Sequence, residues 1–271
     1  MTHFTVIGAG GFIGSRVAAA LTARGEVVET PPRSQQDFDN QDLGRVVYCA
    51  GLTGDFLQRP FDTVEAHVGL INRILKGGRF ERLVYLSSTR VYDSLAARGG
   101  REGDLLELDP ALPRNVYDLS KALGENLCLN SGGGRACVAR LSNVFDADEA
   151  ASGCLSELLL KARLEPEITL ASSPMGGRDY IHVADAVNGL LALATGEAQG
   201  IFNIAGGRTV LNRELVEVFG RAGRKLVLTG QDIPALQPQI QIARMKQLGV
   251  TPMDAVSAIA KILSGPDFQI N

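Results

Sequence analysis

The chain has 271 residues, of which 45% are hydrophobic and 21% charged, which suits one large domain or one domain with a smaller lobe. Its net charge of -3 at pH 7 argues against nucleic acid or an anionic membrane as a partner, and no apolar run approaches the ~20 residues that cross a bilayer. The four cysteines show no metal-ligand spacing and the N-terminus lacks signal-peptide organisation, so we expect a cytoplasmic protein with reduced thiols and no metal.

Short apolar segments alternate with helical patterns along the chain. Strands are predicted at residues 3–7, 27–29, 46–49, 83–87, 136–141 and 201–204. Helices are predicted at residues 13–24, 61–75, 116–129, 184–193 and 212–221. Because continuous apolar strands that alternate with helices form parallel sheets covered on both faces, this pattern predicts an α/β fold with a doubly wound parallel sheet.

A glycine-rich turn separates the first predicted strand from the first predicted helix. Gly8, Gly11 and Gly14 form a G-x-x-G-x-x-G motif, with Phe12 and Ile13 between the last two glycines. Glycine permits a tight turn and lets the backbone approach a pyrophosphate, and the first N–H groups of the helix attract phosphates. The motif, placed between a strand and a helix, predicts a nicotinamide dinucleotide site.

The end of the second predicted strand bears on the choice between NAD and NADP. An acidic residue that closes this strand binds the ribose hydroxyls, and Glu29 is a candidate, with a solvent-facing side chain as the alternative. Arg33 lies where an arginine meets a ribose 2′-phosphate, with a solvated loop arginine as the alternative. We therefore expect NAD(P), with NADP preferred. The segment 33–45 leaves little room for a helix before the next strand.

Tyr117 and Lys121 are the candidate catalytic pair. Four residues apart on a predicted helix, they project from the same face, and a nearby positive charge favours the phenolate of a tyrosine. Tyr117 is expected to exchange a proton with an alcohol or carbonyl while a nicotinamide exchanges the hydride. Ser88 follows the predicted strand at 83–87, where a hydroxyl group lies beside the nicotinamide and holds the reacting oxygen.

The regular alternation of strands and helices ends near residue 141, and the pieces that follow are too scattered to fold alone. We expect residues 1–145 with parts of 180–210 to form a dinucleotide-binding domain. The remainder of 146–271 is expected to form a small C-terminal substrate-binding lobe on the open edge of the sheet.

The chain resembles the extended short-chain dehydrogenases/reductases of the NAD-dependent epimerase/dehydratase family. The resemblance runs nearly end to end through GAGGFIG, VVYCAG, LVYLSSTRVYD, YDLSK, RLSNVF, GRDYIHVADAV and IFNIAGG. It implies a Rossmann domain in which Ala50 and Gly51 of VVYCAG contact the cofactor. It also implies that Ser88 orients the substrate, that Tyr117 is the acid/base, and that Lys121 holds the nicotinamide ribose and lowers the pKa of Tyr117.

Two further segments bear on the substrate. Asn143 in RLSNVF and Arg178 in GRDYIHVADAV match family positions that contact the diphosphate of a nucleotide, which implies a nucleotide sugar. Thr89 and Arg90, which with Ser88 are expected to contact the substrate, stand where sugar-nucleotide dehydratases of the family carry an Asp-Glu pair. This departure argues against a dehydratase.

The predicted function is therefore an NAD(P)-dependent oxidoreductase or epimerase that transfers hydride at a sugar carbon of a nucleotide sugar. Arg33 favours a reductase, whereas SSTRVYD and RDYIHV are closer to epimerases. The alternatives are an NADPH-dependent reductase of a non-nucleotide carbonyl and a non-catalytic NAD(P)-binding protein. The resemblance also allows a homodimer that packs through the helices at 61–75 and 116–129. The sequence does not identify the sugar or the base.

Overall fold

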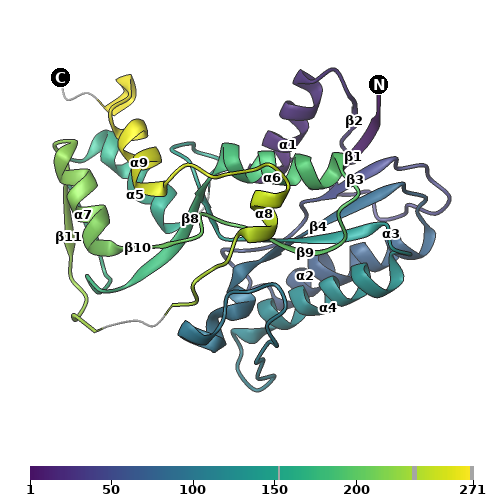
Figure 1. The fold of residues 1–271 in the computed structure, drawn as a ribbon, viewed down its shortest axis with the longest axis horizontal. Helices are drawn as coiled ribbons and strands as arrows, with labels where there is room; N and C mark the ends of the chain where they lie inside the picture. Colours follow the sequence, from purple (N-terminus) through teal and green to yellow (C-terminus); the bar gives the residue numbers. More distant parts are fainter. Residues whose placement is uncertain (152, 234–236, 269–271) are drawn as a thin grey trace.

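Six parallel strands form the central sheet of the protein (Figure 1). The computed structural model describes residues 1–151, 153–233 and 237–268. The strands of this sheet are β1 (His3–Ile7), β2 (Val27–Glu29), β3 (Arg45–Tyr48), β4 (Arg82–Ser88), β5 (Ala136–Leu141) and β9 (Gly200–Ile204). Their order is β2-β1-β3-β4-β5-β9, and every neighbouring pair is parallel. The chain therefore passes from β1 to β2 on one side and then to β3 on the other, which confirms the predicted doubly wound α/β fold.

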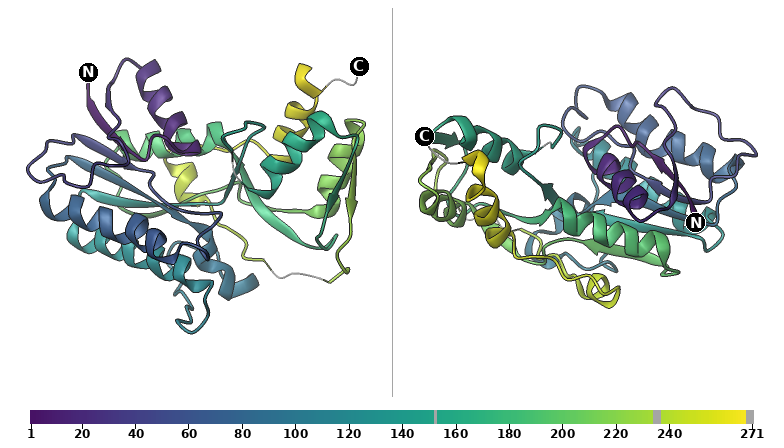
Figure 2. Two further views of the ribbon diagram at one scale, coloured as in Figure 1. Left: turned by 180° about the vertical axis from the view of Figure 1, so that it is seen from behind. Right: turned by 90° about the horizontal axis from the view of Figure 1, so that it is seen from above.

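Helices cover both faces of the central sheet (Figures 1 and 2). α1 (Phe12–Ala23) and α6 (Val183–Thr195) lie on one face, and α3 (Leu70–Gly77) and α4 (Asn115–Ser131) lie on the other. Neighbouring residues of β3 show this division, because Val47 packs with α1 and α6 whereas Val46 packs with α3. Adjacent side chains of a strand point to opposite faces, so a sheet covered on both sides has apolar residues at successive positions.

The predicted helix at residues 61–75 contains a π-helical turn. The structure has α2 (Pro60–Val64), the π-helical turn η1 (Glu65–Gly69) and α3 in one helical stretch. The other predicted strands and helices agree with the observed bounds to within two residues. As expected, the segment between β2 and β3 forms no helix, and the structure describes all of it. None of the helices formed by the described residues is long and apolar enough to span a membrane.

A second group of elements lies beside the central sheet (Figure 1). It contains a three-stranded sheet in the order β10-β8-β6 and a two-stranded sheet of β11 and β7. Its elements are β6 (Asn143–Phe145), β7 (Glu167–Leu170), β8 (Gly177–His182), β10 (Thr209–Leu211), β11 (Lys225–Leu228), α5 (Cys154–Leu164), α7 (Asn212–Arg221) and α9 (Ala255–Leu263). Their buried side chains form an apolar cluster that includes Phe145, Leu159, Ile168, Phe219 and Ile259. None of these five strands was predicted from the sequence.

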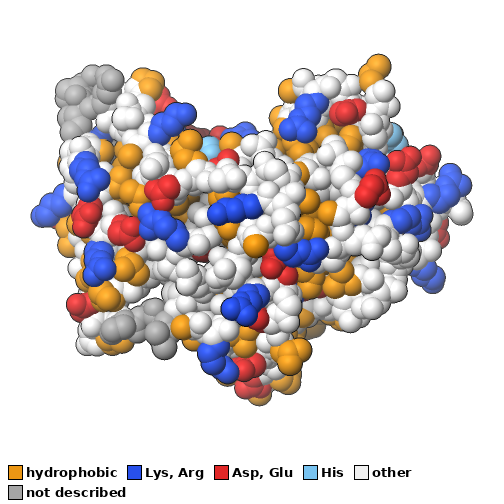
Figure 3. All heavy atoms as spheres, in the orientation of Figure 1, with side chains coloured by type: hydrophobic (Ala, Val, Ile, Leu, Met, Phe, Trp, Pro, Cys, Tyr) orange, Lys and Arg blue, Asp and Glu red, His pale blue; other side chains and the backbone are white. Residues whose placement is uncertain are grey.

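The chain returns to the central sheet near its C-terminal end. α8 (Ala243–Gln247) lies beside β9, and Met245 is buried in the same core as α1 and α6. The surface is indented between the central sheet and the second group of elements (Figure 3).

Candidate active site

A cavity of about 590 Å³ lies where the central sheet meets the second group of elements. One side is lined by the N-terminus of α1, by α4, and by residues at or just beyond the carboxyl ends of β3, β4 and β5. β6, α5 and β8 line the other side. Ligands of open parallel sheets bind beyond the carboxyl ends of the strands, where the strand order reverses, and the cavity occupies that position.

The glycine-rich turn fits the pyrophosphate of a dinucleotide. Gly8 has a φ of +82°, and a Cβ atom there would lie 2.8 Å from the backbone N of Ala50. A Cβ atom on Gly14 would collide with the carbonyl O of Gly8, so the packing of α1 on the turn requires Gly14. Gly8 is required by its positive φ and by the backbone that follows β3. Gly11 differs, because among the described residues its Cβ would meet only Gly8 O, at 3.5 Å. Gly11 is also the N-cap of α1 without a side-chain cap, so the first N–H groups of the helix are available to a phosphate.

The other predicted cofactor residues fall into two groups. Phe12, Ile13, Ala50 and Gly51 line the cavity. A Cβ atom on Gly51 would lie 3.4 Å from the Nζ atom of Lys121, so this position joins the end of β3 to α4. Arg33 instead lies on the exposed loop after β2, outside the lining of the cavity. The carboxylate of Glu29 lies 3.5 Å from the Nε2 atom of His3.

Ser88, Tyr117 and Lys121 all line the cavity. α4 holds Tyr117 and Lys121 one turn apart, with only 4% and 5% of their surfaces exposed. The Nζ atom of Lys121 donates a hydrogen bond to the carbonyl O of Leu86 at 2.8 Å, which holds the ammonium group next to β4. Ser88 ends β4, and its Oγ atom accepts a hydrogen bond from the N–H of Arg90 at 3.2 Å. The structure therefore brings together the three residues that the sequence predicted to be catalytic.

The pKa of Tyr117 is shifted in the direction opposite to the one expected. Burial raises this pKa above its ordinary value and outweighs the lowering by hydrogen bonding from Ser88 and by the charge of Arg90. From the sequence, we expected the ammonium group of Lys121 to lower this pKa. In the structure the cation on the face of the ring is Arg90, whose Cζ atom lies 4.6 Å from the ring centre. Removing a phenolate from water costs more than this one cation returns, so Tyr117 stays protonated at neutral pH.

Burial acts in the other direction on Lys121. It lowers the pKa of Lys121 to about 8, although the carboxylate of Glu125 acts to raise it. An ammonium group loses favourable hydration when it is buried, so its neutral form becomes easier to reach. Lys121 is therefore a cation at neutral pH that loses its proton in a mildly basic solution.

His67 is a site residue that the sequence analysis missed. It lies in η1 and is fully buried, with its ring centre 5.1 Å from that of Tyr117. Its Nε2 atom accepts a hydrogen bond from the N–H of Leu52 at 3.4 Å, and its Nδ1 atom lies 2.8 Å from the Oγ atom of Ser120. Ser120 in turn donates to the carbonyl O of Tyr117. Burial, together with the charge of Lys121, lowers the pKa of His67 to about 2, so the ring is neutral and links η1 to α4.

A buried ion pair behind the site was also missed. Arg140 of β5 and Glu125 of α4 are each 3% exposed, and Arg140 donates hydrogen bonds of 2.9 and 2.6 Å to the carboxylate. Ser87, the neighbour of Ser88, also donates to Glu125. A charged residue inside an apolar strand needs a partner, and this requirement is the signal that would have found the pair. The pair fixes α4 against β4 and β5.

The predicted substrate residues lie at two places in the cavity: Ser88, Thr89 and Arg90 near Tyr117, and Asn143 and Arg178 on β6 and β8. Ser88, Thr89, Arg90, Asn143 and Arg178 all line the cavity. Arg178 is exposed on β8, where its guanidinium group is accessible to a ligand. The Nδ2 atom of Asn143 donates to the carbonyl O of Asp179 at 2.9 Å, so this amide group helps to position β8.

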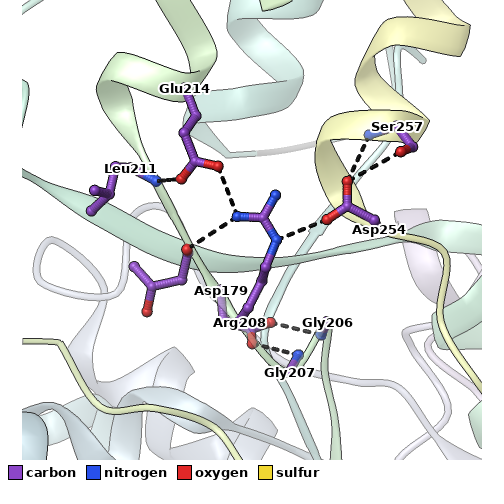
Figure 4. Close-up of polar contacts among 9 residues, drawn as sticks. Asp179, Gly206, Gly207, Arg208, Leu211, Glu214, Asp254 and Ser257 are labelled. Carbon is purple, nitrogen blue, oxygen red and sulfur yellow. Dashed lines mark hydrogen bonds and ion pairs between the residues drawn. The ribbon is translucent and has the colours of Figure 1, made fainter.

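Asp179 connects β8 to the loop after β9 (Figure 4). Its two carboxylate oxygens accept hydrogen bonds from the N–H groups of Gly206 and Gly207, each at 2.7 Å. Burial raises the pKa of Asp179 to about 6, although these N–H groups favour the charged form. Because Arg178 precedes Asp179, this contact sets the place of Arg178 relative to the central sheet.

Comparisons with known proteins agree with this geometry. The sequence matches the model of the NAD dependent epimerase/dehydratase family over residues 4–205. It is 25% identical to a dTDP-4-dehydro-6-deoxy-D-allose reductase from a Streptomyces species, over 90% of this chain and 89% of the relative. The fold is similar to that of MoeE5 in complex with UDP-glucose and NAD, with a TM-score of 0.79 and 21% identity over 96% of this chain and 97% of that one. It is also similar to RMD from Pseudomonas aeruginosa complexed with NADPH, with a TM-score of 0.72 and 21% identity over 97% and 99% of the two chains.

Proposed function

The chain belongs to the NAD dependent epimerase/dehydratase family, and from this premise we propose that it transfers hydride between NAD(P) and a carbon of a nucleotide sugar. One observation carries the proposal: a single cavity joins the start of α1, the Ser88–Tyr117–Lys121 group and Arg178. The relatives support the substrate class, since one reduces a dTDP-linked sugar and another was solved with UDP-glucose. We also propose that residues 1–145 with parts of 180–210 bind the dinucleotide, and that the remainder of 146–271 binds the sugar nucleotide.

The first N–H groups of α1 would hold the pyrophosphate of the dinucleotide, and Lys121 would hold the nicotinamide ribose. When bound, the dinucleotide supplies or accepts the hydride. Ser88 holds the reacting oxygen of the sugar by a hydrogen bond from its hydroxyl group, and Tyr117 gives a proton to that oxygen or removes one from it. Asn143 and Arg178 lie across the cavity, where a guanidinium group can donate two hydrogen bonds to a diphosphate.

The protonation state of the site favours the reductive direction. Tyr117 is a phenol at neutral pH, since the ordinary pKa of a tyrosine is about 10 and burial raises it further, and a phenol can donate its proton to a carbonyl oxygen. The charge of Arg90 on the face of the ring stabilises the phenolate that this step leaves behind, and the proposed role of the Lys121 ammonium group is to add to this effect. An epimerase uses the same residues in both directions, and a dinucleotide that stays bound through purification would favour that version.

Tyr117→Phe tests the acid/base role. We expect turnover of nucleotide sugars to fall by about 100- to 10,000-fold, because the variant lacks the group that transfers the proton. Binding of NAD(P), measured by titration, should stay close to that of the wild type. Tyr180→Phe is a matched control, since it removes the same hydroxyl group from β8 on the other side of the cavity. Turnover that survives in Tyr117→Phe would refute the mechanism.

We infer a preference for NADP from Arg33. Arg33 lies on the exposed loop after β2, and a guanidinium group suits the recognition of a ribose 2′-phosphate. Arg33→Ala should weaken NADP binding about tenfold or more, the effect of losing a charge-assisted hydrogen bond, and should leave NAD binding nearly unchanged. Equal losses for the two dinucleotides would show that Arg33 does not recognise the phosphate.

The homodimer and the cytoplasmic location remain part of the proposal. Phe61 and Val64 of α2 are 88% and 42% exposed, and Leu123 of α4 is 49% exposed. α2 contacts α4, so these apolar side chains lie on neighbouring helices that a second copy could cover. Sedimentation of the wild type beside Phe61→Glu and Leu123→Glu distinguishes a dimer from a monomer.

A further inference from the structure

Arg90 places a positive charge next to the reacting group. It follows β4 by two residues, and its backbone N–H is held by the Oγ atom of Ser88. Its Cζ atom lies 4.6 Å from the centre of the Tyr117 ring and 4.8 Å from the centre of the Phe56 ring. The two aromatic rings, with centres 5.3 Å apart, hold the planar guanidinium group at the wall of the cavity.

This guanidinium group makes no ion pair or side-chain hydrogen bond with the part of the chain that the structure describes. The acidic residues Asp93 and Asp118 pair with Arg114, at 3.1 and 3.6 Å, although the positive charge of Arg90 also acts to lower the pKa of Asp118. Half-buried charges are usually paired in folded proteins, and a guanidinium group carries five N–H donors that need acceptors. The two aromatic rings stabilise its positive charge, but they accept no conventional hydrogen bond from its N–H groups.

Three arginines line the cavity, and Arg114 is the one that pairs with Asp93 and Asp118. The other two, Arg90 and Arg178, have different surroundings. Arg178 comes from β8, where the proposed function has the diphosphate. Arg90 comes from the end of β4, beside Ser88 and Tyr117, where the reacting sugar lies. If the diphosphate of a nucleotide sugar binds to Arg178, the sugar part of the same molecule lies next to Arg90.

We propose that Arg90 is a specificity-determining residue that binds a carboxylate on the sugar, so that the substrate is a nucleotide-linked uronic acid. This inference rests on the proposed function. A carboxylate matches the planar fork of a guanidinium group and accepts two parallel hydrogen bonds from it. A neutral hydroxymethyl group at the same position cannot accept two charge-assisted hydrogen bonds from the guanidinium group.

Binding to matched substrate pairs tests the inference. The probes are UDP-glucuronic acid against UDP-glucose, dTDP-glucuronic acid against dTDP-glucose, and GDP-mannuronic acid against GDP-mannose. Each is titrated calorimetrically into the full-length protein saturated with NADP. For the pair with the preferred base, the wild type should bind the acidic member at least about tenfold more tightly, which is about 1.4 kcal/mol.

The variants then separate recognition from support of the fold. Arg90→Gln should bring the ratio of the two dissociation constants close to 1, and Arg90→Lys should give an intermediate ratio, since it keeps the charge but loses the fork. Arg178→Gln is the matched control, which should weaken both members by the same factor and leave their ratio unchanged. A loss of packing around Tyr117 would weaken both members together and would not move the ratio.

The remaining outcomes overturn different statements. If neither member of any pair binds, the proposed function is wrong and this inference falls with it. If both members bind equally to the wild type, only the inference is wrong. A preference for the acidic sugar that persists in Arg90→Gln would assign the carboxylate site to another residue.

Discussion

Tyr117 and Lys121 are both buried in α4, and burial moves their pKa values in opposite directions because one is charged when deprotonated and the other when protonated. At neutral pH the pair is a phenol beside an ammonium group. This combination is ready to donate a proton and to stabilise the resulting phenolate. The same pair is less suited to begin with removal of a proton from an alcohol.

The lowered pKa of Lys121 predicts the basic limb of the pH profile. Lys121 is charged below its pKa of about 8 and neutral above it, so kcat/KM for reduction should fall as pH rises through about 8. Lys121→Arg, which keeps its charge at all these pH values, should move the fall to higher pH even if its activity is lower. The check is kcat/KM as a function of pH for both proteins. A wild-type profile that stays flat to about pH 10, the ordinary range of a lysine, would contradict the prediction.

At the scale of elements, η1 shows how a local irregularity serves the site. A π-helical turn widens the helix by one residue, and such turns are common at functional sites. Here η1 places the His67 ring between the loop after β3 and α4, 5.1 Å from the Tyr117 ring. The hydrogen bonds through Leu52 and Ser120 then fix the turn of α4 that carries Tyr117.

His67 should make the protein sensitive to acid. Its pKa falls from 6.5 to about 2 on folding, so below pH 6.5 the unfolded chain binds a proton that the folded protein does not. Stability is therefore lost as pH falls, by up to about 1.4 kcal/mol per pH unit. In His67→Gln the free energy of unfolding, measured in urea, should decline less steeply between about pH 6.5 and 5, and the two curves should run parallel above about pH 7. Equal slopes below pH 6.5 would show that the ring is protonated in the folded state.

Most of the central sheet was predictable because its strands other than the exposed edge strand β2 carry buried residues at successive positions, as burial on both faces requires. β8 was not, because it includes Arg178 and Asp179, and the burial of Asp179 is explained by partners that are distant in the sequence, such as Gly206 and Gly207. The residues of the candidate site likewise fall into a group that the sequence predicted and a group that it did not. Ser88, Tyr117 and Lys121 follow from short motifs, whereas the contact of His67 with Ser120 joins residues that are 53 positions apart. No local pattern encodes such a contact.

At the scale of the whole molecule, the position of the second group of elements against the central sheet depends on a few polar contacts. Asp179 binds the backbone of the loop after β9 from a buried position (Figure 4). On the surface nearby, Arg208 pairs with Glu214 and with Asp254, each at 2.8 Å. Buried charge-assisted hydrogen bonds stabilise a fold more than exposed ion pairs do. The relative position of the two sides of the cavity should therefore depend on Asp179.

Asp179→Asn, compared with Asp254→Asn, tests this dependence. An asparagine at 179 can accept from one of the two glycine N–H groups, but its NH₂ group faces the other donor, so we expect a loss of about 1–3 kcal/mol in the free energy of unfolding. Asp254→Asn removes an exposed charge and keeps an oxygen for the N–H of Ser257, so it should cost less than about 1 kcal/mol. Urea unfolding at about pH 8, where Asp179 is ionised because its pKa is about 6, measures both values.

The same preparations should show weaker binding of nucleotide sugars and nearly unchanged binding of NADP in Asp179→Asn, since Arg178 moves with β8 whereas the start of α1 does not. Equal stabilities of the two variants would show that other contacts hold β8 in place.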